Sequence, residues 1–159
     1  MFRVIGLETY SASMNMAIDH ALFEEVEKTG VPVIRFYQWE HGGISIGKGI
    51  SSDLVNSEVC KEKVVSCVRR PTGGNVVFHG SGDFTYAVIA PNSFFGESSG
   101  LVHHEAYKAI CGWIIEALKK VGLSASLFGA KDVVIEGKKV AGNAQKRSEK
   151  AFLQHGALF

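Results

Sequence analysis

Hydrophobic residues recur at helical spacing in two segments of the chain. In the first segment, the apolar residues on one helical face are Ala17, Ile18, Ala21, Leu22 and Val26. Ser13 is placed to cap the start of this helix, and Gly30 is placed to end it. The second stripe consists of Tyr107, Cys111, Ile114, Leu118 and Val121, and Gly122 follows it. The spacing therefore predicts two long helices.

Shorter segments rich in β-branched and aromatic residues lie around these helices and predict strands. The predicted strands cover residues 2–7, 31–39, 44–46, 64–69, 76–78, 84–89, 133–135, 140–145 and 152–159. Many strands with two substantial helices, and without a regular βαβ alternation, predict an α+β fold. In such a fold we expect a mixed, largely antiparallel sheet covered by helices.

Glycine-rich segments and polar caps predict how these elements connect. His41-Gly42-Gly43 predicts a hairpin, and the segments 80–82 and 136–138 predict tight turns. Ser51-Ser52-Asp53 offers a cap for a short helix that extends to about Lys63. Residues 91–100, rich in Pro, Asn, Ser and Gly, predict a loop.

Chain length is compatible with one domain over residues 1–159 and leaves no room for an accessory domain. The chain stops at Phe159 within an apolar strand pattern that has neither turn nor cap. We therefore expect that a C-terminal part is missing or separately encoded.

Composition bounds the partners and the compartment. The chain is 46% hydrophobic and 21% charged, and its net charge of +1 provides no general attraction for nucleic acid or an anionic membrane. No apolar run approaches the ~20 residues of a membrane span, and the first residues have a strand pattern rather than that of a signal peptide. Three cysteines, an odd number outside any CxxC pair, are typical of reduced thiols. We expect a cytoplasmic protein.

The segment Arg69 to His79 combines fixed positive charge with small residues. A guanidinium beside amides that no Cβ obstructs can hold a phosphate or a carboxylate. The candidate ligand-binding residues in this segment are Arg70, Thr72, Gly73, Gly74, Asn75, Val76, Val77, Phe78 and His79. Taken alone, the segment is equally compatible with a structural turn, and His79 with an ordinary half-buried strand histidine.

A second cationic segment runs from Lys138 to Arg147. If Lys139 points inward, its ammonium can neutralise a phosphate or polarise an acyl carbonyl, while Gly142 leaves room for a ligand. Asn143 can add neutral hydrogen bonds. The alternative is a pair of solvated surface lysines.

Two other patterns point away from metal or nucleotide-loop chemistry. Residues 42–49 nearly match a phosphate-binding loop, but Gly49 replaces the hydroxyl that binds the metal, so hairpin glycines are the better interpretation. His20, His41, His103 and His104 form no ligand pattern, and we assign no metal to the protein itself.

The two cationic segments resemble those of the lipoate–protein ligase A and octanoyltransferase family, which is related more distantly to biotin–protein ligases. The similarity runs along nearly the whole chain. It covers residues 15–19, 45–47, 69–79, 132–133, 139–147 and 153–156. The chain departs from the family at Asn75, Val76, Gly80 and Asp83, and it lacks the family's helix after residues 154–156.

The resemblance implies attachment of lipoate, through lipoyl-AMP made from ATP with Mg²⁺, to a lysine of a lipoyl carrier domain. Such carriers belong to 2-oxoacid dehydrogenases or glycine cleavage proteins. Carried over by position, Arg70 and residues 72–78 would line the adenylate and acyl pocket, with His79 nearby, and Lys139 would be the active-site lysine. An accessory ligase subunit is implied for the ATP step.

Two alternatives remain open. One is an octanoyltransferase that takes its acyl group from acyl carrier protein through a cysteine thioester. This route requires a cysteine nucleophile, and residues 123–129, where similar transferases carry it, contain none. A domain that binds lipoate or a carrier protein without chemistry is the other alternative. Biotin transfer is disfavoured because the Gly-Arg-Gly-Arg pattern of biotin ligases is not found.

Overall fold

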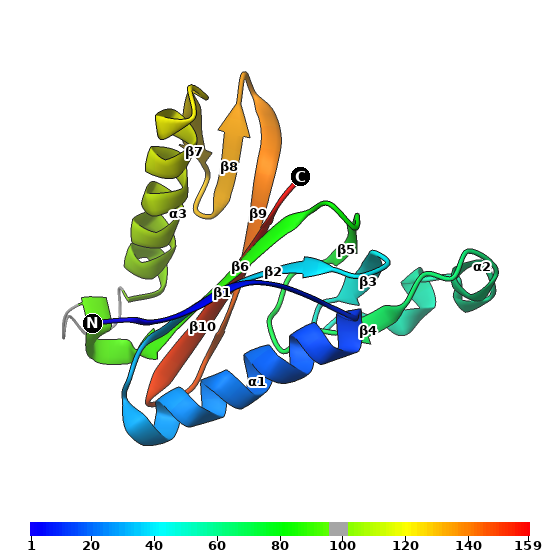
Figure 1. The fold of residues 1–159 in the computed structure, drawn as a ribbon, viewed down its shortest axis with the longest axis horizontal. Coiled ribbons are helices and arrows are strands. Elements are labelled where there is room, and N and C mark those ends of the chain that lie inside the picture. Colours follow the sequence, from blue (N-terminus) through cyan, green and yellow to red (C-terminus); the bar gives the residue numbers. More distant parts are fainter. Residues whose placement is uncertain (96–101) are drawn as a thin grey trace.

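Two β-sheets form the framework of the protein in the computed structural model, which describes residues 1–95 and 102–159 (Figure 1). In this part of the chain, the larger sheet has seven strands in the order β1-β2-β6-β10-β9-β8-β7. Its strands are β1 (Arg3–Tyr10), β2 (Val33–Trp39), β6 (Phe84–Pro91), β7 (Ala125–Phe128), β8 (Asp132–Ile135), β9 (Lys138–Arg147) and β10 (Ala151–Leu158). The smaller sheet has the order β4-β3-β5 and consists of β3 (Gly43–Ile46), β4 (Cys67–Arg69) and β5 (Val76–His79).

Strand directions are mixed but mainly antiparallel. β1 pairs with β2, and β3 with β4, in parallel, whereas the other pairs in both sheets are antiparallel. This arrangement confirms the predicted α+β fold with a mixed, largely antiparallel sheet.

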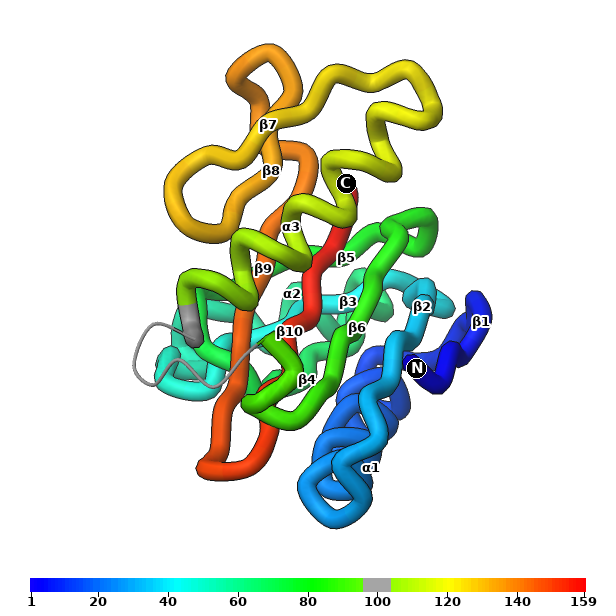
Figure 2. The backbone as a smooth tube through the Cα atoms, turned by 90° about the vertical axis from the view of Figure 1, so that its left-hand side faces the viewer, coloured from blue at the N-terminus to red at the C-terminus, as the bar shows by residue number. Residues whose placement is uncertain are grey.

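The two long helices cover opposite faces of the larger sheet. They are α1 (Ala12–Thr29) and α3 (Val102–Lys120). Side chains alternate across a strand, so Val33 of β2 packs with the α1 core cluster, whereas Ile34 and Phe36 pack with the α3 cluster. In Figure 1 α3 and α1 lie on opposite sides of the strands of the larger sheet, and Figure 2 looks onto the face that α3 covers.

Glycines end both long helices as the spacing predicts. Gly30 adopts φ 69° and its amide donates to the Val26 carbonyl, and Gly122 after α3 has φ 86°. The start of α1 differs from the prediction. Ser11, rather than Ser13, is the N-cap, because its Oγ accepts from the Met14 amide.

One predicted connection is wrong because the strands pair with partners distant in sequence. Residues 31–39 and 44–46 do not form a hairpin, since β2 pairs with β1 and β6 while β3 belongs to the smaller sheet. The segment 80–82 does form a tight turn, in which the Asp83 amide donates to the Gly80 carbonyl, and the strands that it joins, β5 and β6, lie in different sheets. Strand β7 was not predicted.

The remaining short elements lie in two connections. The predicted short helix is split into η1 (Ser52–Leu54) and α2 (Ser57–Glu62), each with its own cap, Ser51 and Asn56. Part of the predicted loop is η2 (Asn92–Phe95), and residues 96–100 of that prediction lie outside the described residues. Among the described helices, none has the length and apolar character needed to cross a bilayer.

Candidate active site

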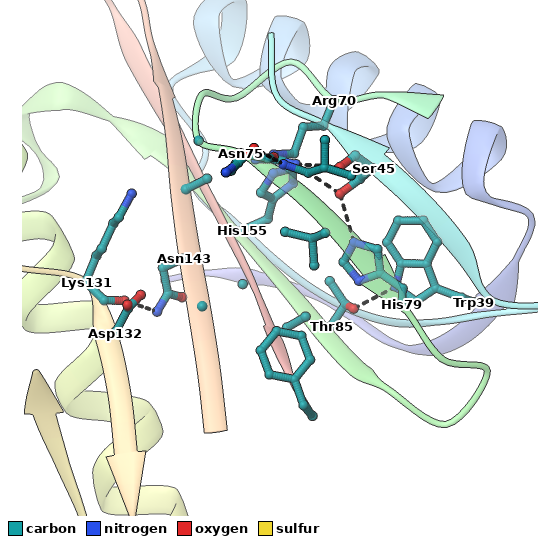
Figure 3. Close-up of a pocket in the computed structure, with 18 of the residues that line it drawn as sticks. Trp39, Ser45, Arg70, Asn75, His79, Thr85, Lys131, Asp132, Asn143 and His155 are labelled. Carbon is teal, nitrogen blue, oxygen red and sulfur yellow. Dashed lines mark hydrogen bonds between the residues drawn. The ribbon is translucent and has the colours of Figure 1, made fainter. Parts of the chain in front are cut away.

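A cavity of about 270 Å³ lies where the two sheets meet (Figure 3). Its walls come from the smaller sheet and the loop before β5, and from the inner strands of the larger sheet. Both cationic segments reach it. The predicted site residues that line the cavity are Arg70, Gly74, Asn75, Val76, Val77, His79, Lys139, Gly142 and Asn143.

Three other predicted site residues do not line this cavity. Thr72 is fully buried, and its hydroxyl contacts the imidazole of His155 at 2.7 Å. The side chain of Phe78 is 62% exposed. The carbonyl oxygen of Gly73 accepts from the Arg70 guanidinium.

Arg70 holds the loop that follows it. Its guanidinium donates to the carbonyl oxygens of Ser45, Gly73 and Asn75 at 2.6–3.2 Å, and to Ser45 Oγ at 3.1 Å. The side chain is 5% exposed, and burial lowers its pKa. Arg70 therefore shapes the cavity wall, with its donors directed at backbone carbonyls.

Close backbone contact fixes the same loop against β3. A Cβ on Gly47 would lie 1.9 Å from the Gly74 carbonyl oxygen, and a Cβ on Gly74, which has φ 91°, would lie 2.8 Å from Arg70 Nη2. Both positions therefore require glycine. The loop that lines the cavity is a single rigid unit with β3.

His79 forms a second wall of the cavity. Its ring stacks on Trp39 with centroids 3.9 Å apart and planes 8° apart, and its Nε2 lies 2.8 Å from Ser45 Oγ. Burial, together with the nearby charges of His155 and Arg70, lowers the pKa of His79 to about 3. Ser45 Oγ also accepts from Arg70 Nη1, and the direction of its hydrogen bond with Nε2 depends on the imidazole tautomer. The Nδ1 of His79 is buried and has no hydrogen-bond partner among the described residues.

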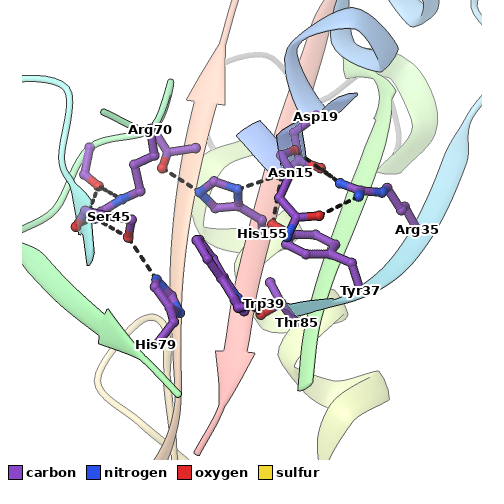
Figure 4. A network of polar contacts seen from close by, with 12 residues as sticks. Asn15, Asp19, Arg35, Tyr37, Trp39, Ser45, Arg70, His79, Thr85 and His155 are labelled. Carbon is purple, nitrogen blue, oxygen red and sulfur yellow. Dashed lines mark hydrogen bonds and ion pairs between the residues drawn. The ribbon is translucent and has the colours of Figure 1, made fainter. Parts of the chain in front are cut away.

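A buried polar network anchors the cavity to α1 (Figure 4). The Asp19 carboxylate accepts from Arg35 at 2.9 Å and from the Tyr37 hydroxyl at 3.0 Å, and it contacts His155 Nδ1 at 3.0 Å. His155 Nε2 then reaches Thr72, so the chain of contacts ends in the glycine loop. Burial and the Asp19 charge hold the pKa of Tyr37 well above its usual value.

Lys139 lies on the opposite side of the cavity from this network. Its Nζ is 3.0 Å from Asp132 Oδ1, and the two side chains are 49% and 26% exposed. Gly142 makes room for Lys139 itself, because a Cβ there would lie 3.0 Å from Lys139 Cε and 3.2 Å from Nζ. The ammonium is thus held at the cavity by its ion pair with Asp132, in space that the absence of a side chain at Gly142 leaves open.

Asn143 forms hydrogen bonds that stabilise the region around this ion pair. Its amide donates to the Lys131 carbonyl at 2.6 Å and to Cys111 Sγ at 3.4 Å, and its oxygen accepts from the Tyr86 hydroxyl. With these groups occupied, Asn143 fixes the start of β8, where Asp132 lies. Burial and then the Asp132 charge raise the pKa of the Cys111 thiol to about 11.

No cysteine lines the cavity in the part of the chain that the structure describes. Cys60 lies in α2, Cys67 in β4 and Cys111 in α3. The same described residues contain no group of three His, Cys, Asp or Glu side chains able to hold a metal ion.

Several cavity residues were not predicted as site residues. They are Met16, Tyr37, Trp39, Ser45, Thr85, Lys131, Asp132, Ala144, His155, Gly156, Ala157 and Phe159. Ser45, Asp132, His155 and Gly156 fall in segments that carry the family resemblance, which was the available signal. Trp39 and Tyr37 lie in a strand whose pattern is that of an ordinary core.

Comparison with known proteins agrees with this geometry. A model of the lipoyl protein ligase A/B catalytic domain matches residues 11–159. The chain belongs to this family. Octanoyltransferase LipM of Lysinibacillus sphaericus is 35% identical over 174 residues, and the match covers 93% of this chain and 62% of that protein. The LipM of Carboxydothermus hydrogenoformans is 35% identical over 173 residues, with 99% and 64% covered. The chain thus spans less than two thirds of these relatives.

Solved structures share the fold. The bi-partite lipoate protein ligase of Thermoplasma acidophilum superposes with a TM-score of 0.84 at 23% identity, covering 99% of this chain and 62% of that one. Lipoate-protein ligase A bound with ATP superposes with a TM-score of 0.83 at 23% identity, covering 98% of this chain and 65% of that one. Biotin acetyl coenzyme A carboxylase synthetase from Helicobacter pylori, with bound biotinylated ATP, superposes with a TM-score of 0.55 at 13% identity, covering 99% of this chain and 59% of that one. The biotin/lipoate ligase type of fold is thereby confirmed.

Proposed function

We propose that this domain transfers an octanoyl group from a carrier-protein thioester to the side-chain amine of a lysine on a lipoyl carrier domain. The observation that carries the proposal is the convergence of Arg70 and Lys139 on one cavity with a mainly apolar wall. The relatives that are 35% identical to this chain are octanoyltransferases, which favours octanoyl over lipoyl as the acyl group.

The cavity suits an acyl chain with its carbonyl group. Its 270 Å³ lies just below the roughly 300–1,000 Å³ typical of small-molecule sites, so the bulk of a carrier-bound donor would remain outside. Apolar contacts come from residues such as Met16, Val77 and Phe159. Lys139, which is half-exposed at the cavity, would stabilise the negative charge that develops on the acyl oxygen during attack.

Lipoyl transfer from lipoyl-AMP is the second candidate, and the absence of a cysteine from the described cavity wall favours it. A thioester route through an enzyme cysteine needs a nucleophile there, whereas an acyl adenylate is already activated. Lys139 and Lys131 fit the phosphate of such a donor, since both ammonium groups are exposed beside the cavity. The described residues do not offer a Mg²⁺ cluster, so Mg²⁺ would arrive with the ATP phosphates.

Mass spectrometry of a lipoyl carrier domain tests both candidates. The chain is incubated with the acceptor and either octanoyl-acyl carrier protein or preformed lipoyl-AMP. Octanoyl addition supports the first proposal, and lipoyl addition alone supports the second. Binding of octanoate or lipoate without any adduct would leave a ligand-binding domain instead. ATP and free lipoate, with and without an accessory ligase subunit, show whether the chain also carries out activation.

A variant with Cys60, Cys67 and Cys111 all changed to alanine separates the routes. Direct transfer to the amine predicts that this variant keeps its activity. Loss of activity in a folded triple variant would indicate a covalent acyl-cysteine step.

A further inference from the structure

Asp132 is the one carboxylate among the described residues that line the cavity. It opens β8 and forms the ion pair with Lys139 at 3.0 Å. Its Oδ1 is buried and accepts no hydrogen bond from the described residues apart from this ion pair. A carboxylate oxygen is therefore held beside the group that would polarise the acyl carbonyl. Figure 3 shows Asp132 and Asn143 on one side of the cavity and Arg70 and His79 across from them.

The proposed reaction requires a proton acceptor at this position. The attacking amine belongs to a lysine, which has an ordinary pKa of about 10.4 and is an ammonium at neutral pH. An ammonium has no lone pair, so it must lose a proton before it attacks an acyl carbon.

The other titratable groups around the cavity are committed elsewhere. His79 Nε2 is engaged by Ser45 Oγ, and its ring is stacked on Trp39. Both nitrogens of His155 are engaged, by Asp19 and by Thr72. Asp19 already accepts from Arg35 and Tyr37 and is fully buried.

The geometry points to Asp132 as the general base that deprotonates the acceptor lysine, released for this role when Lys139 turns to the acyl donor. This inference rests on the proposed function. In the structure the Lys139 ammonium contacts Asp132 Oδ1. Once the ammonium contacts the acyl oxygen, Oδ1 is free to take a hydrogen bond from the incoming amine. Binding of the acyl donor thereby makes the Asp132 carboxylate available to the acceptor amine.

The step balances as follows. Asp132 removes one proton from the ammonium, and the nitrogen lone pair forms a bond to the acyl carbon. The bond from that carbon to the thioester sulfur, or to the adenylate oxygen, then breaks, and its electron pair leaves with that atom. The second proton lost by the nitrogen goes to the leaving group or to solvent, and Asp132 returns its proton to solvent.

Other charged or titratable groups near Asp132 come from two elements and from the residue before β8. They are Lys139 of β9, Cys111 of α3 and the adjacent Lys131. Cys111 feels the Asp132 charge in its raised pKa but remains a buried thiol. None of these groups supplies a second carboxylate that would take over the role of Asp132.

Acyl transfer to two acceptors tests the inference with the full chain. Asp132→Asn is compared with wild type and with Glu136→Gln, which removes an exposed acid from the turn between β8 and β9. One acceptor is the lipoyl carrier domain, and the other is hydroxylamine, which is largely unprotonated at neutral pH and needs no base. Octanoyl-acyl carrier protein and lipoyl-AMP serve as donors in separate arms.

We expect Asp132→Asn to lose at least about 100-fold in transfer to the carrier lysine and to keep hydroxamate formation within a few-fold. Raising the pH to 9.5 should restore much of the lost transfer, and Glu136→Gln should behave as wild type. Equal rates for Asp132→Asn and wild type with both acceptors, or equal losses with both, would overturn the assignment. Asp132→Ser gives the same comparison if the asparagine variant does not fold. Absence of transfer by wild type with either donor would overturn the proposed function and this inference together.

Discussion

The buried imidazole of His79 predicts a specific loss of stability in mild acid. The perturbation is a change from pH 7.5 to pH 5.0, applied to wild type and to His79→Gln. Glutamine keeps an amide that can donate to or accept from Ser45 Oγ, but it does not titrate. The remaining histidines are common to both proteins, so the difference between the two pH responses isolates His79.

The magnitude follows from the two pKa values of this residue. The ordinary value is 6.5, and burial lowers the pKa of His79 in the folded protein to about 3. Between these values the unfolded chain binds a proton that the folded protein does not bind, so stability falls as the pH falls from 6.5. The 1.5 units from 6.5 to 5.0, at 1.36 kcal/mol each, give about 2 kcal/mol. The effect is essentially absent at pH 7.5.

Urea unfolding provides the measurement. Fluorescence of Trp39, which stacks on His79, reports the transition at each pH. Wild type should lose about 2 kcal/mol more than His79→Gln between pH 7.5 and 5.0. If both proteins lose the same free energy of unfolding, His79 does not occupy the low-dielectric position described here.

Three further predictions concern the loop, the ion pair and the buried network. Lys139→Ala should reduce acyl transfer by about 100-fold or more with little change in Tm, whereas Lys138→Ala, its neighbour outside the cavity wall, should retain activity; similar activities would remove Lys139 from the mechanism. Gly47→Ala should cost about 1–3 kcal/mol in urea unfolding because its Cβ would overlap the Gly74 carbonyl, while Gly49→Ala, which has open space around it, should be nearly neutral; equal stability would contradict the close contact. Asp19→Asn should cost about 3–5 kcal/mol by leaving Arg35 buried without its carboxylate, compared with little for the exposed Asp53→Asn; a small effect for Asp19→Asn would show that water replaces the carboxylate.

Local signals in the sequence were sufficient for the helices and for most strands. The stripe that ends at Gly30 and the one that ends at Gly122 depend on residues within a few turns, so spacing alone locates both helices. Strand pairing was different. Whether residues 44–46 pair with 31–39 or with 67–69 depends on packing between distant segments, which no turn signal encodes.

The same distinction applies to the site. Arg70 and Lys139 were identifiable because charge beside glycine is locally unusual, and both line the cavity. The structural role of Arg70 could not be predicted from the sequence, because its carbonyl partners include Ser45, which lies 25 residues earlier in the chain. Trp39 and His155 escaped prediction because, within an apolar strand, a residue facing a cavity has the same pattern as one facing the core.

The hydrogen bonds from Arg70 to three carbonyl oxygens affect how the cavity discriminates between acyl donors. On the Arg70 side of the cavity the guanidinium donates to Ser45 and to backbone carbonyl oxygens, so this side selects molecules by their shape. Recognition of their charge then falls to Lys139 on the far wall, whose half-exposed ammonium is paired with Asp132. Substitutions that alter the shape of the cavity on the Arg70 side and substitutions that alter the charge at Lys139 should therefore change the preference for acyl donors independently.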